Sequence, residues 1–285
     1  MRMMTNRWRV ATIAAASVVA ISLATLTEPG QVATASFLSQ FRSQRLAVIT
    51  VDSAIERGPF GQLERVGSIQ GPGKDRFENV STVAEAAQKV GFTLRQPDPA
   101  TLPAGYDPKP TVRVTRTATW RFTFDTAKAR AYFKEIGNTG MTIPDKFNGA
   151  SLVVSVPSGA VLEYRRAGGG EDRLAVLQSG EISAGAEGGV SLEEMREFLL
   201  RLPGLPPETV RQLRNIQDWK NTLPIPIPAD RVNWQDATIA GGPGLVLNDI
   251  GGVGSAAIWQ RDGRIYGVAG TVRSADVQRV ANGLR

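Results

Sequence analysis

The 285-residue sequence contains no cysteine and no histidine. Without cysteine it can form no disulfide, no thiol nucleophile, no iron–sulfur cluster and no lipid-modified cysteine. Without histidine it can form no Ser-His-Asp triad, no imidazole base and no ordinary zinc site. The sequence therefore predicts a protein that is not an enzyme, with no catalytic residues, no cofactor-binding residues and no metal ligands.

A basic patch of the kind that binds nucleic acid is also missing. The net charge is +6, but Arg2, Arg7 and Arg9 stand at the N-terminus and leave the remainder with 30 basic and 27 acidic residues. The other arginines are scattered, and no nucleic-acid-binding motif accompanies them. We therefore expect no nucleic-acid partner. Hydrophobic residues make up 42% of the chain and charged residues 21%, values that are typical of a folded globular protein.

One long uncharged run stands near the N-terminus. Met1 to Arg9 is basic, Val10 to Leu26 holds seventeen residues without charge, and Thr27-Glu28-Pro29-Gly30 ends the run. This order is typical of an export signal. As a helix the run would be roughly 25 Å long, a little less than the ~30 Å hydrocarbon core of a bilayer. The sequence thus predicts that residues 1–35 direct the chain to the membrane.

The fate of this segment has two readings. A signal anchor is favoured, because the run is longer than a usual signal-peptide core. Cleavage is the alternative, since Ala33-Thr34-Ala35 precedes Ser36 as a candidate site. No Lys or Arg follows the run until Arg42, which places the N-terminus inside. We expect a single-pass protein of a bacterial cytoplasmic membrane with its bulk outside, or a protein secreted after cleavage near Ala35; a buried core helix is the disfavoured third reading.

The rest of the chain predicts an α+β fold with twisted antiparallel sheets and packed helices, because strands and helices are grouped rather than alternating. Residues 36–80 are predicted to form a helix, a strand and a linker. Residues 81–285 are predicted to form an α+β domain, either as one unit or as two lobes, 81–180 and 190–285.

Helices are predicted from apolar spacing together with capping residues and glycine stops. Ser191-Leu192-Glu193-Glu194 is a capping box. The predicted helices lie within Ser36–Arg45, at Val83–Val90, from Asp125 as N-cap to Ile136, from Ser191 to Arg201, from Pro207 toward Trp219, and after Ser274 as cap, with Val277, Val280, Ala281 and Leu284 on its apolar face.

Strands are predicted from alternation and from turn residues. Thr111 to Asp125 alternates over too long a stretch for one straight strand, so two strands or one bent strand are expected. Asp262-Gly263 is a strong hairpin signal. The other expected strands are Leu46–Val51, one near Val66–Gln70, a meander of Ser151–Val156, Val161–Arg165 and Arg173–Ser179, and Leu245–Leu247, Ala256–Arg261 and Ile265–Ala269.

The proline-rich segment Leu223 to Pro228 is predicted to be stiff and extended, as a spacer or as a strap over a surface.

Several short motifs are better explained by structure than by chemistry. Gly71-Pro72-Gly73-Lys74 lacks the remaining residues of a phosphate-binding loop and predicts a turn. The glycine-rich stretches 241–244 and 251–254 predict hairpin loops. Glu193, Glu194 and Glu197 stand at a helix start, where carboxylates are favourable. Three acidic residues could ligate calcium but lack the spacing of a calcium-binding loop: Asp145, Glu163 and Asp249.

The predicted helical hairpin carries charges of both signs. Arg196, Arg201, Arg211 and Arg214 form either a basic face toward anionic lipid or, with the interleaved glutamates, a solvated ion-paired surface. The second reading is favoured because four glutamates stand among these arginines.

Three strings resemble an uncharacterised bacterial domain family that is found outside the membrane in anti-sigma-factor-like proteins and sporulation lipoproteins. They are Ala84-Glu85-Ala86-Ala87 through Gly91-Phe92, Leu102-Pro103-Ala104-Gly105-Tyr106, and Ile258 to Gly270 with the final helix. The resemblance implies a single-pass protein with an extracytoplasmic α+β domain, and it carries over no catalytic residue. Only nine residues precede the apolar run, too few to bind a sigma factor.

Three functions follow as hypotheses. The leading one is a membrane-anchored extracytoplasmic domain that binds or senses an envelope protein or a lipid ligand without catalysis. The alternative is a carrier of lipid or lipoprotein, in which a curved sheet encloses an apolar cavity of roughly several hundred Å³ and the helical hairpin serves as lid. The third is a carboxylate-based hydrolase, which requires a cleft with two or more carboxylates of perturbed pKa.

Overall fold

The structure, a computed structural model, describes most of the chain beyond the N-terminal segment. Its described residues are 40–51, 63–73, 76–138, 140–169, 172–252 and 254–285. The predicted apolar run Val10–Leu26 and the candidate cleavage site lie outside them. Within the described part of the chain, no helix combines the length and the apolar character needed to cross a membrane.

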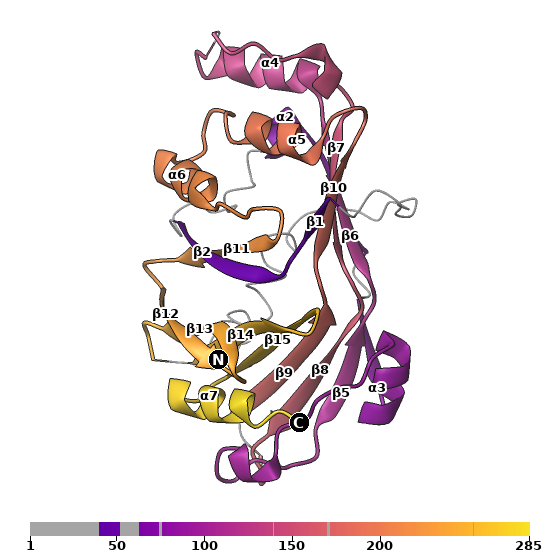
Figure 1. Cartoon of the computed structure of the whole chain (residues 1–285), viewed down its shortest axis with the longest axis vertical. Coiled ribbons are helices and arrows are strands. Elements are labelled where there is room, and N and C mark those ends of the chain that lie inside the picture. The colour runs from indigo at the N-terminus through magenta and orange to yellow at the C-terminus, as the bar shows by residue number, and fades with distance from the viewer. Residues whose placement is uncertain (1–39, 52–62, 74–75, 139, 170–171, 253) are drawn as a thin grey trace, which may run out of the picture.

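The fold is mixed α+β, with two antiparallel sheets at the two ends of an elongated molecule (Figure 1). The eight-stranded sheet has the order β12-β13-β14-β15-β9-β8-β5-β4, and the five-stranded sheet has the order β1-β10-β7-β6-β3. The strands of the first are β4 (Phe77–Val80), β5 (Thr111–Thr115), β8 (Gly159–Arg165), β9 (Arg173–Gly180), β12 (Val232–Ile239), β13 (Gly242–Asp249), β14 (Ser255–Arg261) and β15 (Arg264–Gly270). Those of the second are β1 (Phe41–Arg42), β3 (Gly67–Gln70), β6 (Ala118–Phe124), β7 (Ser151–Val156) and β10 (Ser183–Glu187).

Three segments of the chain pass directly from one antiparallel sheet to the other. β5 leads directly into β6, β7 into β8, and β9 into β10, so that three neighbouring strands of one sheet continue into three neighbouring strands of the other. Figure 1 shows these strands running along the long axis of the molecule. Of the two alternatives expected for Thr111–Asp125, the structure shows two strands, β5 and β6, and the alternate apolar residues of both are buried.

The prediction of a three-stranded meander is wrong for its first strand, β7. β8 and β9 form the expected hairpin, but β7 pairs with β6 and β10 in the other sheet. Pro157, which has no N–H to donate, separates β7 from β8. At Gly159, an added Cβ would lie 2.6 Å from the Gln178 carbonyl oxygen, so the chain enters β8 at a close backbone approach.

A third, two-stranded sheet consists of β2 (Arg45–Val51) and β11 (Thr222–Pro228), which pair in parallel. This pair corrects the expectation of antiparallel sheets alone. The predicted extended conformation of Leu223–Pro228 is confirmed. Ile225 and Ile227 are buried on one side against β13 and β14, while Pro224 and Pro226 face the other side.

The described residues contain six α-helices: α2 (Leu63–Val66), α3 (Val83–Val90), α4 (Thr126–Glu135), α5 (Leu192–Leu199), α6 (Pro207–Asn215) and α7 (Ser274–Asn282), with short 3₁₀ turns η1 (Pro99–Thr101) and η2 (Asp145–Phe147). The helices with clear capping signals begin and end near the predicted residues. Asp125 caps α4, and Gly91 ends α3 with φ +77°. The capping box of Ser191 and Glu194 is present at α5. The predicted apolar face of the last helix is buried.

Some boundaries and elements differ from prediction. The part of Ser36–Arg45 that the structure describes contains a strand and no helix, because Phe41 and Arg42 pair with β10 and Phe41 becomes buried there. Helix α6 ends at Asn215 rather than near Trp219, and α7 has Arg273, not Ser274, at its N-cap. The sequence patterns do not predict the strands β4, β10 and β12.

Strands from residues 41–80 are hydrogen-bonded to strands from later in the chain. β1 pairs with β10, β2 with β11, β3 with β6, and β4 with β5. Residues 41–80 thus contribute strands to all three sheets. The predicted division at residue 81, and the two lobes 81–180 and 190–285, stay predictions.

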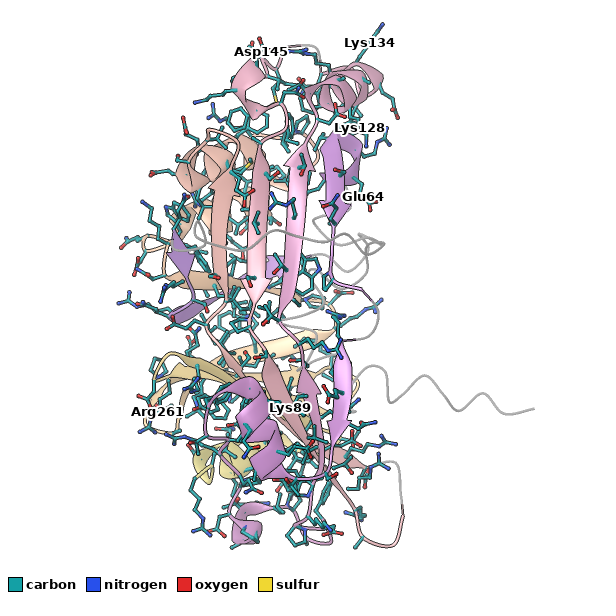
Figure 2. All side chains as sticks on the ribbon, turned by 90° about the vertical axis from the view of Figure 1, so that its right-hand side faces the viewer. Glu64, Lys89, Lys128, Lys134, Asp145 and Arg261 are labelled. Atoms are coloured by element: carbon teal, nitrogen blue, oxygen red, sulfur yellow. The ribbon has the colours of Figure 1, made fainter. Side chains whose placement is uncertain are left out.

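Helices cover the sheets unequally. α3 and α7 pack on the eight-stranded sheet, and α5 packs against β10 of the five-stranded sheet. Figure 2 shows the side of the molecule on which α3, with Lys89, lies over the eight-stranded sheet while no described helix crosses the five-stranded one. The opposite face of the five-stranded sheet looks toward α5, α6 and the β2–β11 pair (Figure 1). That inner face holds the candidate site.

Candidate functional site: an apolar cavity under the five-stranded sheet

A cavity of about 370 Å³ lies between the five-stranded sheet, the α5–α6 hairpin and the β2–β11 pair. Three kinds of secondary structure supply its walls, and their apolar side chains converge on it. Among the thirty described residues that line it, only Arg196 is charged. Its volume lies within the ~300–1,000 Å³ usual for ligand pockets.

The sheet wall is built from alternating residues of the two central strands. On β7, Leu152, Val154 and Val156 face the cavity and keep part of their surface exposed to it. On β6, Trp120 and Phe122 also line the cavity but are buried, and they are paired across the strands with Val154 and Leu152. The period of two along each strand therefore gives this wall an unbroken apolar surface.

The helix wall follows the helical period. Leu192, Met195 and Leu199 of α5 recur at the spacing that places side chains on one face of a helix, and all three line the cavity. From α6 and the residue after it, Leu213 and Ile216 complete this wall.

The floor is the β2–β11 pair, which separates the cavity from a second apolar core. Ile49 of β2 with Pro224 and Pro226 of β11 line the cavity. The intervening Ile225 and Ile227 pack on the opposite side against strands of the eight-stranded sheet. Because successive N–H groups of a strand point to opposite edges, prolines at alternate positions remove donors from one edge only. β11 can therefore pair with β2 and still present apolar rings to the cavity.

Polar contacts fasten the hairpin over the cavity. The Gln212 amide on α6 and Thr50 on β2 exchange hydrogen bonds: Thr50 N–H donates to Gln212 Oε1 at 2.8 Å, and Gln212 Nε2 donates to Thr50 Oγ1 at 2.8 Å. Arg196 of α5 donates to the Leu213 carbonyl oxygen at 2.7 Å and to Glu197 at 2.6 Å. Its guanidinium also lies 5.1 Å from the ring centre of Trp219. The one charged lining residue is thus held by partners within the fold.

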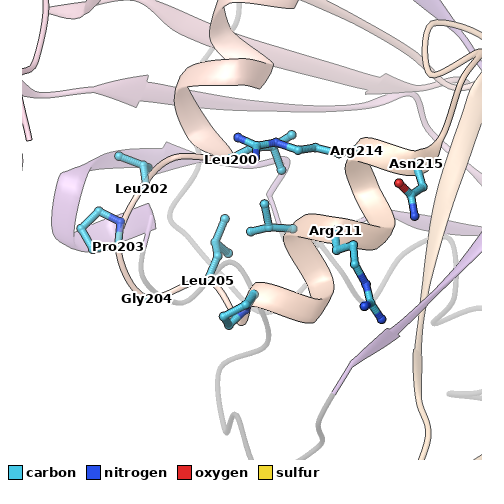
Figure 3. A pocket seen from close by; sticks show the side chains of 10 residues that line it. Leu200, Leu202, Pro203, Gly204, Leu205, Arg211, Arg214 and Asn215 are labelled. Atoms are coloured by element: carbon cyan, nitrogen blue, oxygen red, sulfur yellow. The ribbon is translucent and has the colours of Figure 1, made fainter.

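A second, open pocket of about 470 Å³ adjoins the cavity at the turn between α5 and α6. Leu200, Leu202, Pro203 and Leu205 line both spaces. The other wall of the open pocket comes from α6 and includes Arg211 and Arg214 (Figure 3). No carboxylate is among its described lining residues.

The structure does not bring the three candidate calcium ligands together. Glu163 lies on β8, bound by Arg113 at 3.3 Å, Arg165 at 2.9 Å and Arg173 at 3.1 Å. Asp145 pairs with Arg130 at 3.0 Å in η2, and Asp249 ends β13. In the part of the chain that the structure describes, no group of three or more potential ligands of the types His, Cys, Asp and Glu is found.

The glutamates at the start of α5 have structural partners. Glu194 accepts a hydrogen bond from Lys146 and another from the Ser191 backbone N–H, and these bonds lower its pKa from 4.5 to about 2. Glu193 lies 3.7 Å from Lys220, and Glu197 pairs with Arg196. The helix-start interpretation is thereby supported.

The ion-paired reading of the hairpin is confirmed for two of its four arginines. Arg196 pairs with Glu197, and Arg211 lies 2.5 Å from Glu208. Arg201, just beyond α5, donates to the Glu197 carbonyl oxygen in the last turn of that helix at 3.0 Å. Arg214 forms no ion pair of this kind with the described residues.

The glycine motifs fall at turns only in part. Gly241 has a positive φ in the β12–β13 turn, as expected of a hairpin loop, but Gly242, Pro243 and Gly244 belong to β13. Gly252 also has a positive φ, at the β13–β14 turn. Of the motif that begins at Gly71, Lys74 lies outside the described residues.

The strings that carry the family resemblance lie away from the cavity. Gly105 adopts φ +83° and Tyr106 is buried, bridged to Arg166. Trp259 and Tyr266 face each other across the β14–β15 hairpin with ring centres 5.3 Å apart. All four serve turns or the core of the eight-stranded sheet.

Comparisons of the chain with protein-family models, with curated proteins and with solved structures find no match. The family resemblance therefore stays a prediction, and the site is interpreted from its own geometry.

Proposed function

We propose that this chain is a non-catalytic binding protein whose cavity takes up the acyl chains of a lipid or of a lipoprotein. The observation that carries the proposal is the cavity itself, about 370 Å³ in volume, whose described lining residues are apolar apart from Arg196, Thr209 and Thr222. Each methylene group that moves from water into such a space contributes about 0.8 kcal/mol. An acyl chain therefore gains affinity along its whole length and needs no polar contact.

Some side chains that line the cavity are partly exposed to it, which favours a ligand-binding site over a defect in packing. Protein interiors are close-packed and contain few voids larger than a water molecule. Leu152, Val154 and Val156 stand at alternate positions of a central strand, and each keeps exposed surface toward the cavity. These three side chains on one face of the strand are only partly covered by the apolar residues that pack against them, and a bound acyl chain would cover the rest.

The proposed place of action is the outer side of a bacterial cytoplasmic membrane. It rests on the basic residues before Val10–Leu26 and on the length of that uncharged run. The segment would keep the chain as a single-pass membrane protein, or would release it after cleavage near Ala35. The anchored form would hold the binding domain next to the lipid of the bilayer.

Photochemical cross-linking tests the proposal. The full chain is reconstituted in vesicles of phosphatidylcholine that contain a small share of phosphatidylcholine with a diazirine on one acyl chain. After illumination, the labelled peptides are identified by mass spectrometry. We expect labels on β6, β7 and α5, whose residues line the cavity. Labels confined to residues 1–35 would contradict the proposal, because those residues are expected to meet lipid in any case.

Two variants with a blocked cavity sharpen the result. Val154→Trp on β7 and Leu199→Trp on α5 place an indole in the cavity from opposite walls. Ile250→Trp is the matched control, because Ile250 is 52% exposed and does not line the cavity. Labelling of the cavity peptides should fall at least fivefold in the two blocked variants and remain unchanged in the control. Equal labelling in all of them would mean that the lipid lies elsewhere.

A further inference from the structure

The open pocket next to the cavity has the place and the charge of a headgroup site. It is formed by the α5–α6 turn and by one side of α6, and Figure 3 shows Arg214 reaching across it toward Leu200. Leu200, Leu202 and Leu205 line both this pocket and the cavity. A ligand with its apolar part in the cavity would therefore have its polar end within reach of α6.

The charges of this pocket are of one sign. Arg211 and Arg214 are exposed, and no acidic side chain is among the described residues that line the pocket. The pair of Arg211 with Glu208 is solvent-exposed on both sides, with 70% and 54% of the two side chains accessible. Such a pair contributes little, about 0–1 kcal/mol. Arg214 has no hydrogen bond or ion pair with another residue that the structure describes. Among the described residues, Arg214 therefore has no competing anion, and Arg211 has only the exposed Glu208.

We propose that Arg211 and Arg214 bind the phosphate group of a phospholipid whose acyl chains occupy the cavity. This inference rests on the proposed function and adds the class of headgroup. A guanidinium group presents a planar set of N–H donors that matches phosphate oxygens in pairs. The two residues lie one helical turn apart on α6, and in Figure 3 Arg214 extends across the pocket while Arg211 extends to another side. A phosphate held by both would therefore require rotation of the exposed Arg211 side chain toward Arg214. The apolar cavity supplies the affinity for the acyl chains, and the arginines supply the preference for a phosphorylated headgroup.

Two photoactivatable probes with the same diazirine acyl chains test this assignment. One is phosphatidylglycerol, and the other is diacylglycerol, which has no phosphate. Each is mixed at the same low share into phosphatidylcholine vesicles that contain the full chain. Labelling of the cavity peptides of β7 and α5 by phosphatidylglycerol should exceed labelling by diacylglycerol about three- to fivefold. At raised salt the difference should shrink, because exposed charges are screened.

Charge reversal identifies the residues. Arg211→Glu and Arg214→Glu should each lower labelling by phosphatidylglycerol toward the level of diacylglycerol and leave labelling by diacylglycerol unchanged. Arg231→Glu is the matched control: its side chain is 71% exposed, close to the 70% of Arg211, and it also lies near a single carboxylate, Asp230, at 3.9 Å. It stands outside both pockets and should change neither signal.

The outcomes separate the two proposals. If neither probe labels the cavity peptides, the proposed function fails. If both probes label them equally, or if the control lowers the phosphatidylglycerol signal as much as Arg214→Glu does, the cavity binds lipid but the headgroup assignment is overturned. In a parallel titration with inorganic phosphate, we expect no saturable binding below millimolar concentration. Tight binding of inorganic phosphate alone would overturn the headgroup assignment and identify the arginines as a site for free phosphate.

Discussion

At the scale of single residues, the most demanding position is the buried carboxylate of Glu163. Its side chain is 7% exposed, and three arginines from β5, β8 and β9 converge on it. A buried charge is tolerated only with compensating partners, and the loss of one partner leaves the others uncompensated. Glu163 therefore stabilises the eight-stranded sheet by neutralising arginines on neighbouring strands, which accounts for it without a metal ion.

The first prediction concerns this cluster. Glu163→Gln should lower the free energy of unfolding by about 2–3 kcal/mol, because three neighbouring guanidinium groups then lose the carboxylate that they share. Urea denaturation measures the change. Glu135→Gln is the control, since Glu135 pairs with Arg65 at an exposed site and should cost less than about 1 kcal/mol. A cost for Glu163→Gln as small as that of the control would show that the cluster does not stabilise the sheet.

The second prediction concerns the capping carboxylate of Glu194. Its pKa falls from 4.5 to about 2 because the folded state supplies hydrogen bonds from Lys146 and from the Ser191 N–H. A carboxylate with a lowered folded-state pKa stabilises the protein above the unfolded pKa, and this stabilisation is lost as pH falls toward the folded value. The denaturation midpoint of the wild type should therefore exceed that of Glu194→Gln at pH 6. The difference should shrink between about pH 4.5 and pH 2. A difference that is constant over this range would contradict the assignment.

At the scale of elements, the sequence predicts local structure better than pairing. Helices α3, α4 and α5 begin and end near their predicted residues, because Thr82, Asp125 and Ser191 cap them by contacts within a few residues. The β14–β15 turn is likewise predictable, since Asp262 and Gly263 both adopt the positive φ that this turn requires. Such features depend on neighbours in the chain and can be read from it.

The assignment of strands to sheets depends on distant residues and was predicted poorly. β7 resembles the first strand of a meander in its alternation, yet its partners are β6 and β10. Phe41 has helical spacing with its neighbours, yet it pairs with Ala184, which lies far away in the sequence. The cavity could be predicted as a possibility but not located. The spacing of Leu192, Met195 and Leu199 would be the same against a filled core.

The third prediction concerns the attachment of α6 to β2. Gln212→Ala removes the hydrogen bonds with Thr50, each worth about 1 kcal/mol. Backbone hydrogen exchange in α6 should become faster, while exchange in β8 and β9 should stay as it is, because those strands belong to another core. Gln278→Ala is the control, since the Gln278 amide donates within its own helix, to the Ser274 carbonyl oxygen at 3.4 Å. Faster exchange throughout the chain after Gln212→Ala would show a global loss of stability instead of a released helix.

At the scale of the whole molecule, three pairs of consecutive strands connect a well-packed end with an end that contains a cavity. The eight-stranded sheet buries its residues against α3 and α7 and stacks Trp259 on Tyr266. The five-stranded sheet meets α5, α6 and the β2–β11 pair around the cavity. Because β5, β8 and β9 continue into β6, β7 and β10, the packed end can hold the cavity wall in place without filling it. The arrangement suits a protein that must keep an apolar site open between ligands.

The last prediction follows from the linkage between binding and folding. A ligand that binds only the folded state stabilises it by about 2.7 kcal/mol at a hundredfold excess over its Kd. The full chain in an uncharged detergent should therefore unfold at a higher temperature when dihexanoyl phosphatidylglycerol is added. The shift should be absent in Val154→Trp, whose indole occupies the cavity, and present in Ile250→Trp, which leaves the cavity unchanged. A shift of the same size in Val154→Trp would assign the stabilisation to a lipid contact outside the cavity, and the cavity would then have no share in lipid binding.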